Sequence, residues 1–437
     1  MNERFHLIEE TARKFKETSQ EHDENVTFPF ENFEALKKIG YPQLSVPAEY
    51  GGGGISLREL MKHQEIIAKY DGATALSIGW HMGIIMDIGE KKAWDDAKYR
   101  KVVQDVIENG ALVNNLATEP ATGSPTRGGR PETTARKEGD GWILNGRKTF
   151  ATLSPILKYG VVSAAIEGSD EVGNFVVDSA LKGVRVDETW NSVAMRASGS
   201  HDFIMEDVHV QEEDLVSYRT LGKKDPAGWL LHIPACYLGI ARAAQDAALE
   251  FATTYSPNSI KGTISELPNV QEKLGRIEML LMESEHFLYS VARQWDESDE
   301  EERSRMGSEL GAVKTSIVNK AVEAVDLAMR VVGAKSLSEG RDIEFHIVSQ
   351  CQDEGGLIKL FSGQDFVGPF KNQPVTIGKT RLGRKGLSWI DDTDIKTEHR
   401  SHGTQNCGDV GGADDVESRR LGEGFDDDTD ILSGYRG

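Results

Sequence analysis

A chain of 437 residues is long enough for two or three domains, each with its own apolar core. Its formal net charge of -21 argues against nonspecific binding to nucleic acid or to an anionic membrane surface. The three cysteines form no CxxC pair and no cluster with histidine, so we expect neither a disulfide framework nor a metal site. No segment approaches the ~18 apolar residues of a membrane-spanning helix, and the charged segment Met1–Gln20 has no signal-peptide core. Composition therefore predicts a soluble, cytoplasmic protein.

Residues 1–112 follow helical periodicity and predict an all-helical N-terminal domain. Apolar residues recur at three- and four-residue steps from Leu57 to Tyr70, and a second apolar helix is expected from Ala73 to Ile88. The segment Pro47–Gly54, with four consecutive glycines, predicts a flexible turn before these helices.

Residues 113–217 change to the period of strands and predict a small β domain. Asp140–Gly141 and Asn145–Gly146 are dipeptides typical of tight turns. Short runs of strand-forming residues follow at Gly160–Ile166, Asn174–Val177 and His201–Val210.

Phe150 and Thr152 close the segment that begins at Asp140. On a regular strand, residues two apart point to the same face. Such a face places a ring against a flat cofactor and a hydrogen-bond donor at the cofactor's edge. A flavin has this shape and chemistry.

Residues 226–345 return to helical periodicity and predict an antiparallel bundle. A first helix is expected from Tyr237 to Phe251. Two further apolar stripes follow: Leu274, Ile277, Leu281, Leu288, Val291 and Trp295, then Leu310, Val313, Ile317, Ala321, Val325, Ala328 and Val332.

Residues 346–437 are rich in glycine, carry acidic clusters and keep no periodicity, which predicts a largely disordered tail. We hypothesise that the abrupt change after Phe345 reflects a reading-frame change in the gene or a diverged terminus. Resequencing that recovers helical code in another frame supports the first explanation, and an unchanged frame rejects it.

Four motifs in this order resemble the acyl-CoA dehydrogenase family, and most closely a bacterial branch of it. They are Val46–Gly52, Thr118–Ser124, Asp140–Lys148 and Met195–Val210. The resemblance spans roughly residues 5–345. It implies an α+β fold with an N-terminal α domain, a middle β-barrel domain and a C-terminal four-helix bundle, assembled as a homodimer or homotetramer.

The resemblance also implies a flavin, FAD or alternatively FMN, bound by the middle domain. The backbone of Leu116 and Ala117 and the side chain of Thr118 would bind its pyrimidine edge. Gly123 and Ser124 would lie near the pyrophosphate or the acyl chain.

In the same resemblance, Phe150 takes the place of the tryptophan that usually packs on the isoalloxazine ring. Thr152 would donate a hydrogen bond to flavin N5, where a donor stabilises the charge that develops during transfer. Without the surrounding motifs, we would interpret both residues as ordinary core and edge residues of a β hairpin. Glu119 is expected to fix its turn rather than to act in catalysis, and Arg147 and Lys148 are expected to be solvated.

The implied activity is the removal of a proton and a hydride from the α and β carbons of an acyl-CoA, as in fatty acid metabolism. Electrons would pass to an electron-transfer flavoprotein. The reaction needs a carboxylate base. In most of the family this base is a glutamate near the C-terminus, and Ser338–Asp342 lies too early in the chain to be that element. The family's other location for the base is a Glu-Arg step shortly before the Leu-Gly of the next helix. Counting back from Leu238–Gly239 finds Trp229–Leu230 there. The catalytic base is therefore not identified.

Two alternatives follow from the missing base. Flavin monooxygenases of the dibenzothiophene type are similar in fold and also lack the glutamate, and His81 lies where they have an active-site histidine. With a pKa near 6.5, such a histidine could move a proton. His81 could equally be a buried, hydrogen-bonded histidine of an apolar helix. The third reading is a flavin- or CoA-binding homologue without turnover.

Overall fold

A computed structural model of the chain describes residues 2–121, 129–219 and 225–337, which all belong to one compact unit. The tail predicted at 346–437 lies outside these residues, as do Gly123 and Ser124. No helix within the described ranges is long and apolar enough to cross a membrane.

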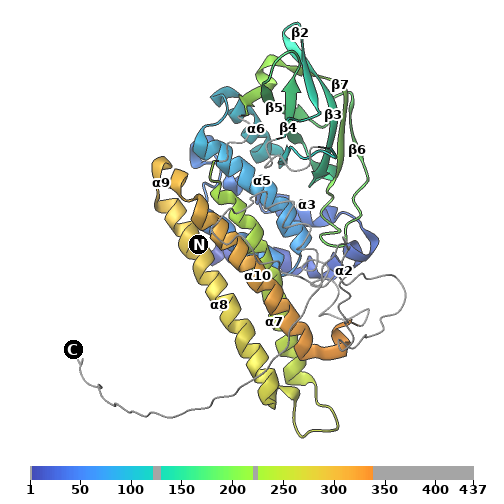
Figure 1. Cartoon of the computed structure of the whole chain (residues 1–437), viewed down its shortest axis with the longest axis vertical. Helices are drawn as coiled ribbons and strands as arrows, with labels where there is room; N and C mark the ends of the chain where they lie inside the picture. The colour runs from blue at the N-terminus through green and yellow to red at the C-terminus, as the bar shows by residue number, and fades with distance from the viewer. Residues whose placement is uncertain (1, 122–128, 220–224, 338–437) are drawn as a thin grey trace, which may run out of the picture. The chain divides into compact units, whose positions relative to one another are not determined.

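The N-terminal part is helical up to Asn109 (Figure 1). Helices α4 and α5 correspond to the two stretches predicted from periodicity, although α4 ends at Ala68, before Tyr70, and both begin at capping side chains. Ser56 and Glu59 form a capping box at α4, and Asp71 accepts the backbone N–H of Thr74 at α5. The elements are α1 (Asn2–Arg13), α2 (Lys16–Asn25), α3 (Phe30–Lys38), η1 (Pro42–Ser45), η2 (Ala48–Tyr50), α4 (Leu57–Ala68), α5 (Gly72–Lys91) and α6 (Asp96–Asn109).

The glycine-rich segment before α4 is a turn, as predicted, and its backbone is hydrogen-bonded. The N–H groups of Gly53 and Gly54 donate to the carbonyls of Gln43 and Val46 at 3.0 and 2.9 Å. A Cβ at Gly52 would lie 2.3 Å from the carbonyl oxygen of Val46. Glycine is needed here because the backbone passes so close to itself.

The middle part is an eight-stranded sheet with the order β6-β7-β3-β2-β4-β5-β8 (Figure 1). Strand β1 lies off this path and pairs parallel with β4. The strands are β1 (Val113–Leu116), β2 (Thr134–Glu138), β3 (Gly141–Ala151), β4 (Tyr159–Ile166), β5 (Val172–Asp178), β6 (Val184–Asp187), β7 (His201–Gln211) and β8 (Leu215–Tyr218).

Asn145–Gly146 is a bulge within the continuous strand β3, and the predicted turn at this dipeptide is wrong. The register against β7 shifts between Leu144 and Gly146. A Cβ at Gly146 would lie 2.4 Å from Thr133 Oγ1 on the neighbouring chain segment. The dipeptide therefore serves close backbone packing and a change of register.

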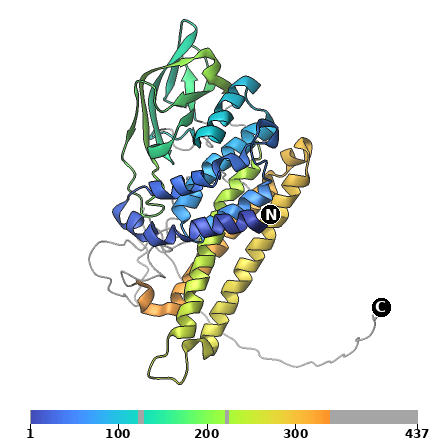
Figure 2. The same cartoon turned by 180° about the vertical axis from the view of Figure 1, so that it is seen from behind.

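The C-terminal part is helical again, and α7, α8 and α10 run side by side (Figure 1, Figure 2). The two predicted stripes lie on α8 and α10, and all their members are buried except Leu274, which is partly exposed. Helix α4 also packs against α7 and α8. The described elements are η6 (Gly228–Leu231), α7 (His232–Thr254), η7 (Ile264–Glu266), α8 (Pro268–Glu297), α9 (Glu300–Arg305), α10 (Gly307–Val332) and η8 (Gly333–Leu337).

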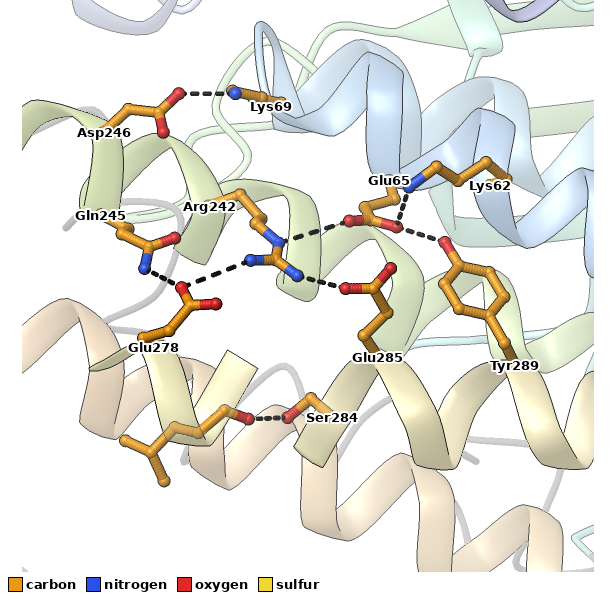
Figure 3. Close-up of polar contacts among 11 residues, drawn as sticks. Lys62, Glu65, Lys69, Arg242, Gln245, Asp246, Glu278, Ser284, Glu285 and Tyr289 are labelled. Carbon is orange, nitrogen blue, oxygen red and sulfur yellow. Dashed lines mark hydrogen bonds and ion pairs between the residues drawn. The ribbon is translucent and has the colours of Figure 1, made fainter. Parts of the chain in front are cut away.

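A polar cluster centred on Arg242 joins α4 to α7 and α8 (Figure 3). The Arg242 guanidinium donates to Glu285 and lies 3.6 Å from Glu65 and 3.9 Å from Glu278. Tyr289 also donates to the Glu65 carboxylate, which is only 7% exposed. Lys62 of α4 adds a second cation, 3.1 Å from the Glu65 carboxylate. Arg242 thus links carboxylates of α4 and α8.

Replacing Arg242 by Met is expected to lower the free energy of unfolding by about 1–3 kcal/mol, because the nearly buried Glu65 keeps only Lys62 as a cation. Urea denaturation measures this loss. Lys69→Met is the matched control, since its ion pair with Asp246 is more exposed, at 35% and 57%, and should contribute less than about 1 kcal/mol. Equal losses in both variants would show that the Arg242 cluster stabilises the fold no more than an exposed ion pair does.

Candidate functional site

The exit of β1 and the end of β3 lie side by side, and this brings most of the predicted flavin-binding residues together. The N–H of Thr149 donates to the carbonyl of Thr118 at 2.9 Å. The amide of Asn114 in β1 donates to the carbonyl of Thr152 at 2.8 Å. Leu116 is buried at the end of β1, and Ala117 and Thr118 are half-buried beyond it.

Phe150 and Thr152 do not stand in a regular strand, so the argument from alternating faces does not apply to them. The pairing of β3 with β7 is irregular between Lys148 and Ala151, and Phe150 has a positive φ of 55°. The N–H of Thr152 donates to the carbonyl of Phe150 at 2.9 Å. A left-handed aromatic residue stores backbone strain, which functional sites commonly retain.

Trp190 supplies a second ring at this place, and the sequence analysis missed it. Its ring centroid lies 5.6 Å from that of Phe150, edge to face at 74°. The indole N–H donates to the carbonyl of Met195 at 3.0 Å, which fixes the ring. The available signal was its position five residues before the motif that starts at Met195.

Thr152 carries a buried hydroxyl that is hydrogen-bonded to a second one. Its Oγ1 lies 2.9 Å from Ser200 Oγ, which lies 2.7 Å from Ser198 Oγ. Beside them, Asn114 Oδ1 is buried and has no hydrogen-bond partner among the described residues. The neighbourhood of Thr152 therefore offers both a hydroxyl donor and an amide acceptor.

Glu119 holds its turn, as predicted, whereas the prediction that Lys148 is solvated is wrong. Glu119 accepts the N–H groups of Glu132 and Thr133 at 2.6 and 3.0 Å. Lys148 is fully buried, and its Nζ lies 2.5 Å from Glu119 Oε1 and 2.6 Å from the carbonyl of Ser163. Arg147 is about half exposed beside Asp202.

The charges of this pair depend on each other. Burial opposes ionisation of Glu119, but the Lys148 ammonium and the donors around the carboxylate keep its pKa below the usual value. Burial lowers the pKa of Lys148 to about 8, against the attraction of Glu119. Both groups are charged at pH 7, and the pair ties the β1 exit to β3 immediately beside Thr118.

Both ring nitrogens of His81 are used by backbone groups. The N–H of Val113 donates to Nδ1 at 3.0 Å, so Nε2 carries the proton and donates to the carbonyl of Pro42 at 3.1 Å. Burial lowers the pKa of this fully buried histidine to about 4. The geometry is that of a neutral residue that fastens β1 to α5, which favours the structural alternative over proton transfer.

Trp229 occupies the position expected for a catalytic base by counting back from Leu238–Gly239. It belongs to a cluster of rings between α5 and α7. It stacks on His232 at 5.7 Å and meets the edge of Trp80 at 5.5 Å. A Cβ at Gly83 would lie 2.3 Å from the Trp229 ring, so the indole rests directly on α5. This position offers packing and no carboxylate.

The residues around Thr152 fit a flat heteroaromatic group with hydrogen-bonding edges. Phe150 and Trp190 offer ring surfaces, the Thr118 segment offers backbone groups, and the unpartnered Asn114 oxygen marks unsatisfied polarity at the same place. A flavin has these features. The fit concerns Leu116, Ala117, Thr118, Phe150 and Thr152, whereas Gly123 and Ser124 lie outside the described residues.

Comparison with known sequences decides the family. Residues 2–102 match the N-terminal domain of acyl-CoA dehydrogenases, residues 115–208 the middle domain and residues 231–346 the C-terminal domain. The Bacillus subtilis (strain 168) protein named "Putative acyl-CoA dehydrogenase YdbM" is 46% identical over 335 residues, which cover 76% of this chain and 87% of that protein. The chain belongs to the acyl-CoA dehydrogenase family.

Solved structures agree with this fold. Butyryl-CoA dehydrogenase from Megasphaera elsdenii aligns with a TM-score of 0.69 at 20% identity, covering 79% of this chain and 92% of that one. The FMN-bound dibenzothiophene monooxygenase TdsC from Paenibacillus sp. A11-2 aligns with a TM-score of 0.73 at 19% identity, covering 82% and 94%. The predicted fold of helical, β and helical parts is confirmed. Membership of the family makes the chain a flavin-dependent oxidoreductase.

Proposed function

We propose that the protein is an acyl-CoA dehydrogenase that uses FAD to oxidise the α–β bond of an acyl-CoA thioester. The observation that carries this proposal is the convergence of the Thr118 segment, Phe150 and Thr152 where β1 and β3 end. The 46% identity to a relative named as an acyl-CoA dehydrogenase supports the same substrate class. A soluble electron-transfer flavoprotein is the proposed electron acceptor, and the proposed assembly is a homodimer or homotetramer.

FAD, when bound, supplies the acceptor for the hydride that leaves the β carbon. The backbone of Leu116 and Ala117 and the side chain of Thr118 bind and orient its pyrimidine edge. Phe150 covers the ring, and Thr152 holds a proton toward N5, where negative charge develops. The buried Glu119–Lys148 pair keeps the two strand ends in register, so that these donors stay in place.

The proton from the α carbon needs a base that none of the positions considered supplies. Trp229 has no basic atom, and His81 uses both ring nitrogens for backbone groups. We therefore leave the base unassigned.

A flavin monooxygenase is the second candidate function. Two observations favour it: position 229 carries a tryptophan and not a carboxylate, and the fold is similar to that of TdsC. FMN would then replace FAD, and added reduced flavin with oxygen would replace the electron-transfer flavoprotein. The engaged nitrogens of His81 argue against the role that this residue would have in such an enzyme.

Anaerobic titration of the purified protein with a panel of CoA thioesters tests the proposal. Bleaching of the flavin absorbance by one member of the panel is the expected result. Oxygen consumption that requires added reduced flavin, without bleaching, would establish the monooxygenase instead. A protein that binds flavin or CoA but shows neither reaction would be the homologue without turnover.

A further inference from the structure

Three buried hydroxyl groups form a chain that ends at Thr152. Thr152, Ser200 and Ser198 are 2%, 4% and 1% exposed, and their oxygens follow one another at 2.9 and 2.7 Å. The two serines immediately precede β7, whereas Thr152 follows β3. The chain therefore crosses between neighbouring strands.

The backbone around the serines is held firmly. The N–H of Leu153 donates to the carbonyl of Ser198 at 3.3 Å, and both the N–H and the hydroxyl of Ser154 donate to the carbonyl of Gly199, at 3.2 and 2.8 Å. Gly199 has a φ of 56°, and a Cβ there would lie 2.6 Å from the ring of Phe28. Glycine between the two serines thus allows the close packing that brings Ser200 to Thr152 and Ser198 to Ser200.

A count of protons shows what this chain can do. Each hydroxyl donates one hydrogen, so three hydroxyls joined by two hydrogen bonds leave one O–H uncommitted. If the bonds run from Ser198 to Ser200 to Thr152, the uncommitted hydrogen lies on Thr152. Donation into Thr152 also strengthens Thr152 as a donor, because hydrogen bonds in a chain polarise one another.

We infer that Ser200 is a positioning residue that donates to Thr152 and so directs the Thr152 hydroxyl hydrogen toward flavin N5. In this arrangement Ser198 donates to Ser200 from the far end of the chain. The inference rests on the proposed flavin site and adds that Thr152 acts as a donor only with Ser200 behind it. Ser200 itself does not touch the flavin in this arrangement.

A double-mutant cycle on flavin affinity tests the inference without an activity assay. Ser200→Ala is expected to raise the dissociation constant of oxidised FAD about 3- to 10-fold, the range of one hydrogen bond, and to shift the visible spectrum of the bound flavin. Thr152→Val should raise the constant at least as much. Adding Ser200→Ala to Thr152→Val should change neither quantity further, because Ser200 acts only through the Thr152 hydroxyl.

Two further variants separate positioning from packing. Ser200→Thr keeps the hydroxyl and should restore the affinity and spectrum. Ser284→Ala removes a buried hydroxyl of α8 that donates to the carbonyl of Leu280 at 2.7 Å and does not belong to the chain of hydroxyls, so the flavin spectrum should not move.

Two results would overturn this inference and leave the proposed function standing. In the first, Ser200→Ala weakens flavin binding equally in the wild type and in Thr152→Val. In the second, Ser200→Ala does not change flavin affinity although Thr152→Val weakens it. If Ser200→Ala does not fold, the visible spectrum of flavin bound to Ser200→Thr decides: a spectrum unlike that of the wild type would overturn the inference. Wild-type protein that binds no flavin at all would overturn the proposed function as well.

Discussion

Replacing Lys148 by Met should lower the free energy of unfolding by about 3–5 kcal/mol, because the Glu119 carboxylate would be left buried without its cation. Lys148 and Glu119 are 0% and 1% exposed as side chains, and their charged atoms are 2.5 Å apart. The carbonyl of Ser163 would lose its donor at the same time. Urea denaturation followed by tryptophan fluorescence measures the loss.

The matched control is Lys158→Met, which removes a cation from the partly exposed pair with Asp178, where the side chains are 36% and 32% exposed. Its loss should stay below about 1 kcal/mol. The double variant Glu119→Gln/Lys148→Met should recover much of the stability, since no buried charge remains. A Lys148→Met loss no larger than that of Lys158→Met would refute the importance of the buried pair.

Acidification from pH 7 to pH 5 is expected to remove stability on the order of 4 kcal/mol, because three buried histidines are neutral in the fold. Burial lowers the pKa of His63 to about 3 and the pKa values of His81 and His232 to about 4, from an ordinary 6.5. The unfolded chain therefore binds more protons below pH 6.5, and stability falls until the pH reaches about 4. Asp71 offsets part of this loss, since burial raises its pKa to about 6.

His63 offers a direct test of this pH dependence. Its ring lies against Phe5 at 5.2 Å and Tyr41 at 5.7 Å, and neither nitrogen has a hydrogen-bond partner in the part of the chain that the structure describes. His63→Phe should therefore keep the packing and reduce the slope of stability against pH by about one proton. An unchanged slope in His63→Phe would contradict this account.

The helical parts could be predicted from the sequence because their burial follows the 3.6-residue period closely. The stripes from Ile277 to Trp295 and from Leu310 to Val332 need only periodicity to place them, and both are buried in the structure. The capping box of Ser56 and Glu59 marks the start of α4 in the same local way.

The β domain was harder to predict, because its decisive contacts join residues far apart in the chain. Nothing near Lys148 in the sequence shows that Glu119 lies opposite, 29 residues away. Asn145–Gly146 carries a turn signal but meets Thr133 and becomes a bulge. Local propensity gave the wrong answer wherever tertiary packing decided the backbone.

The candidate site, too, could be predicted from the sequence only in part. The motif resemblance pointed to Phe150 and Thr152, although the argument from strand alternation behind their pairing fails at the irregular end of β3. Trp190 was missed, and Ser200 was noted only as part of the motif Met195–Val210, because only the folded sheet brings them to these residues.

The most direct test of the proposed site is a crystal structure of the protein grown with FAD. The account predicts the isoalloxazine ring against Phe150, with Thr152 Oγ1 within hydrogen-bonding distance of N5 and the Thr118 segment at the pyrimidine edge. A ring bound elsewhere, or packed side chains filling the space beside Phe150, would contradict it.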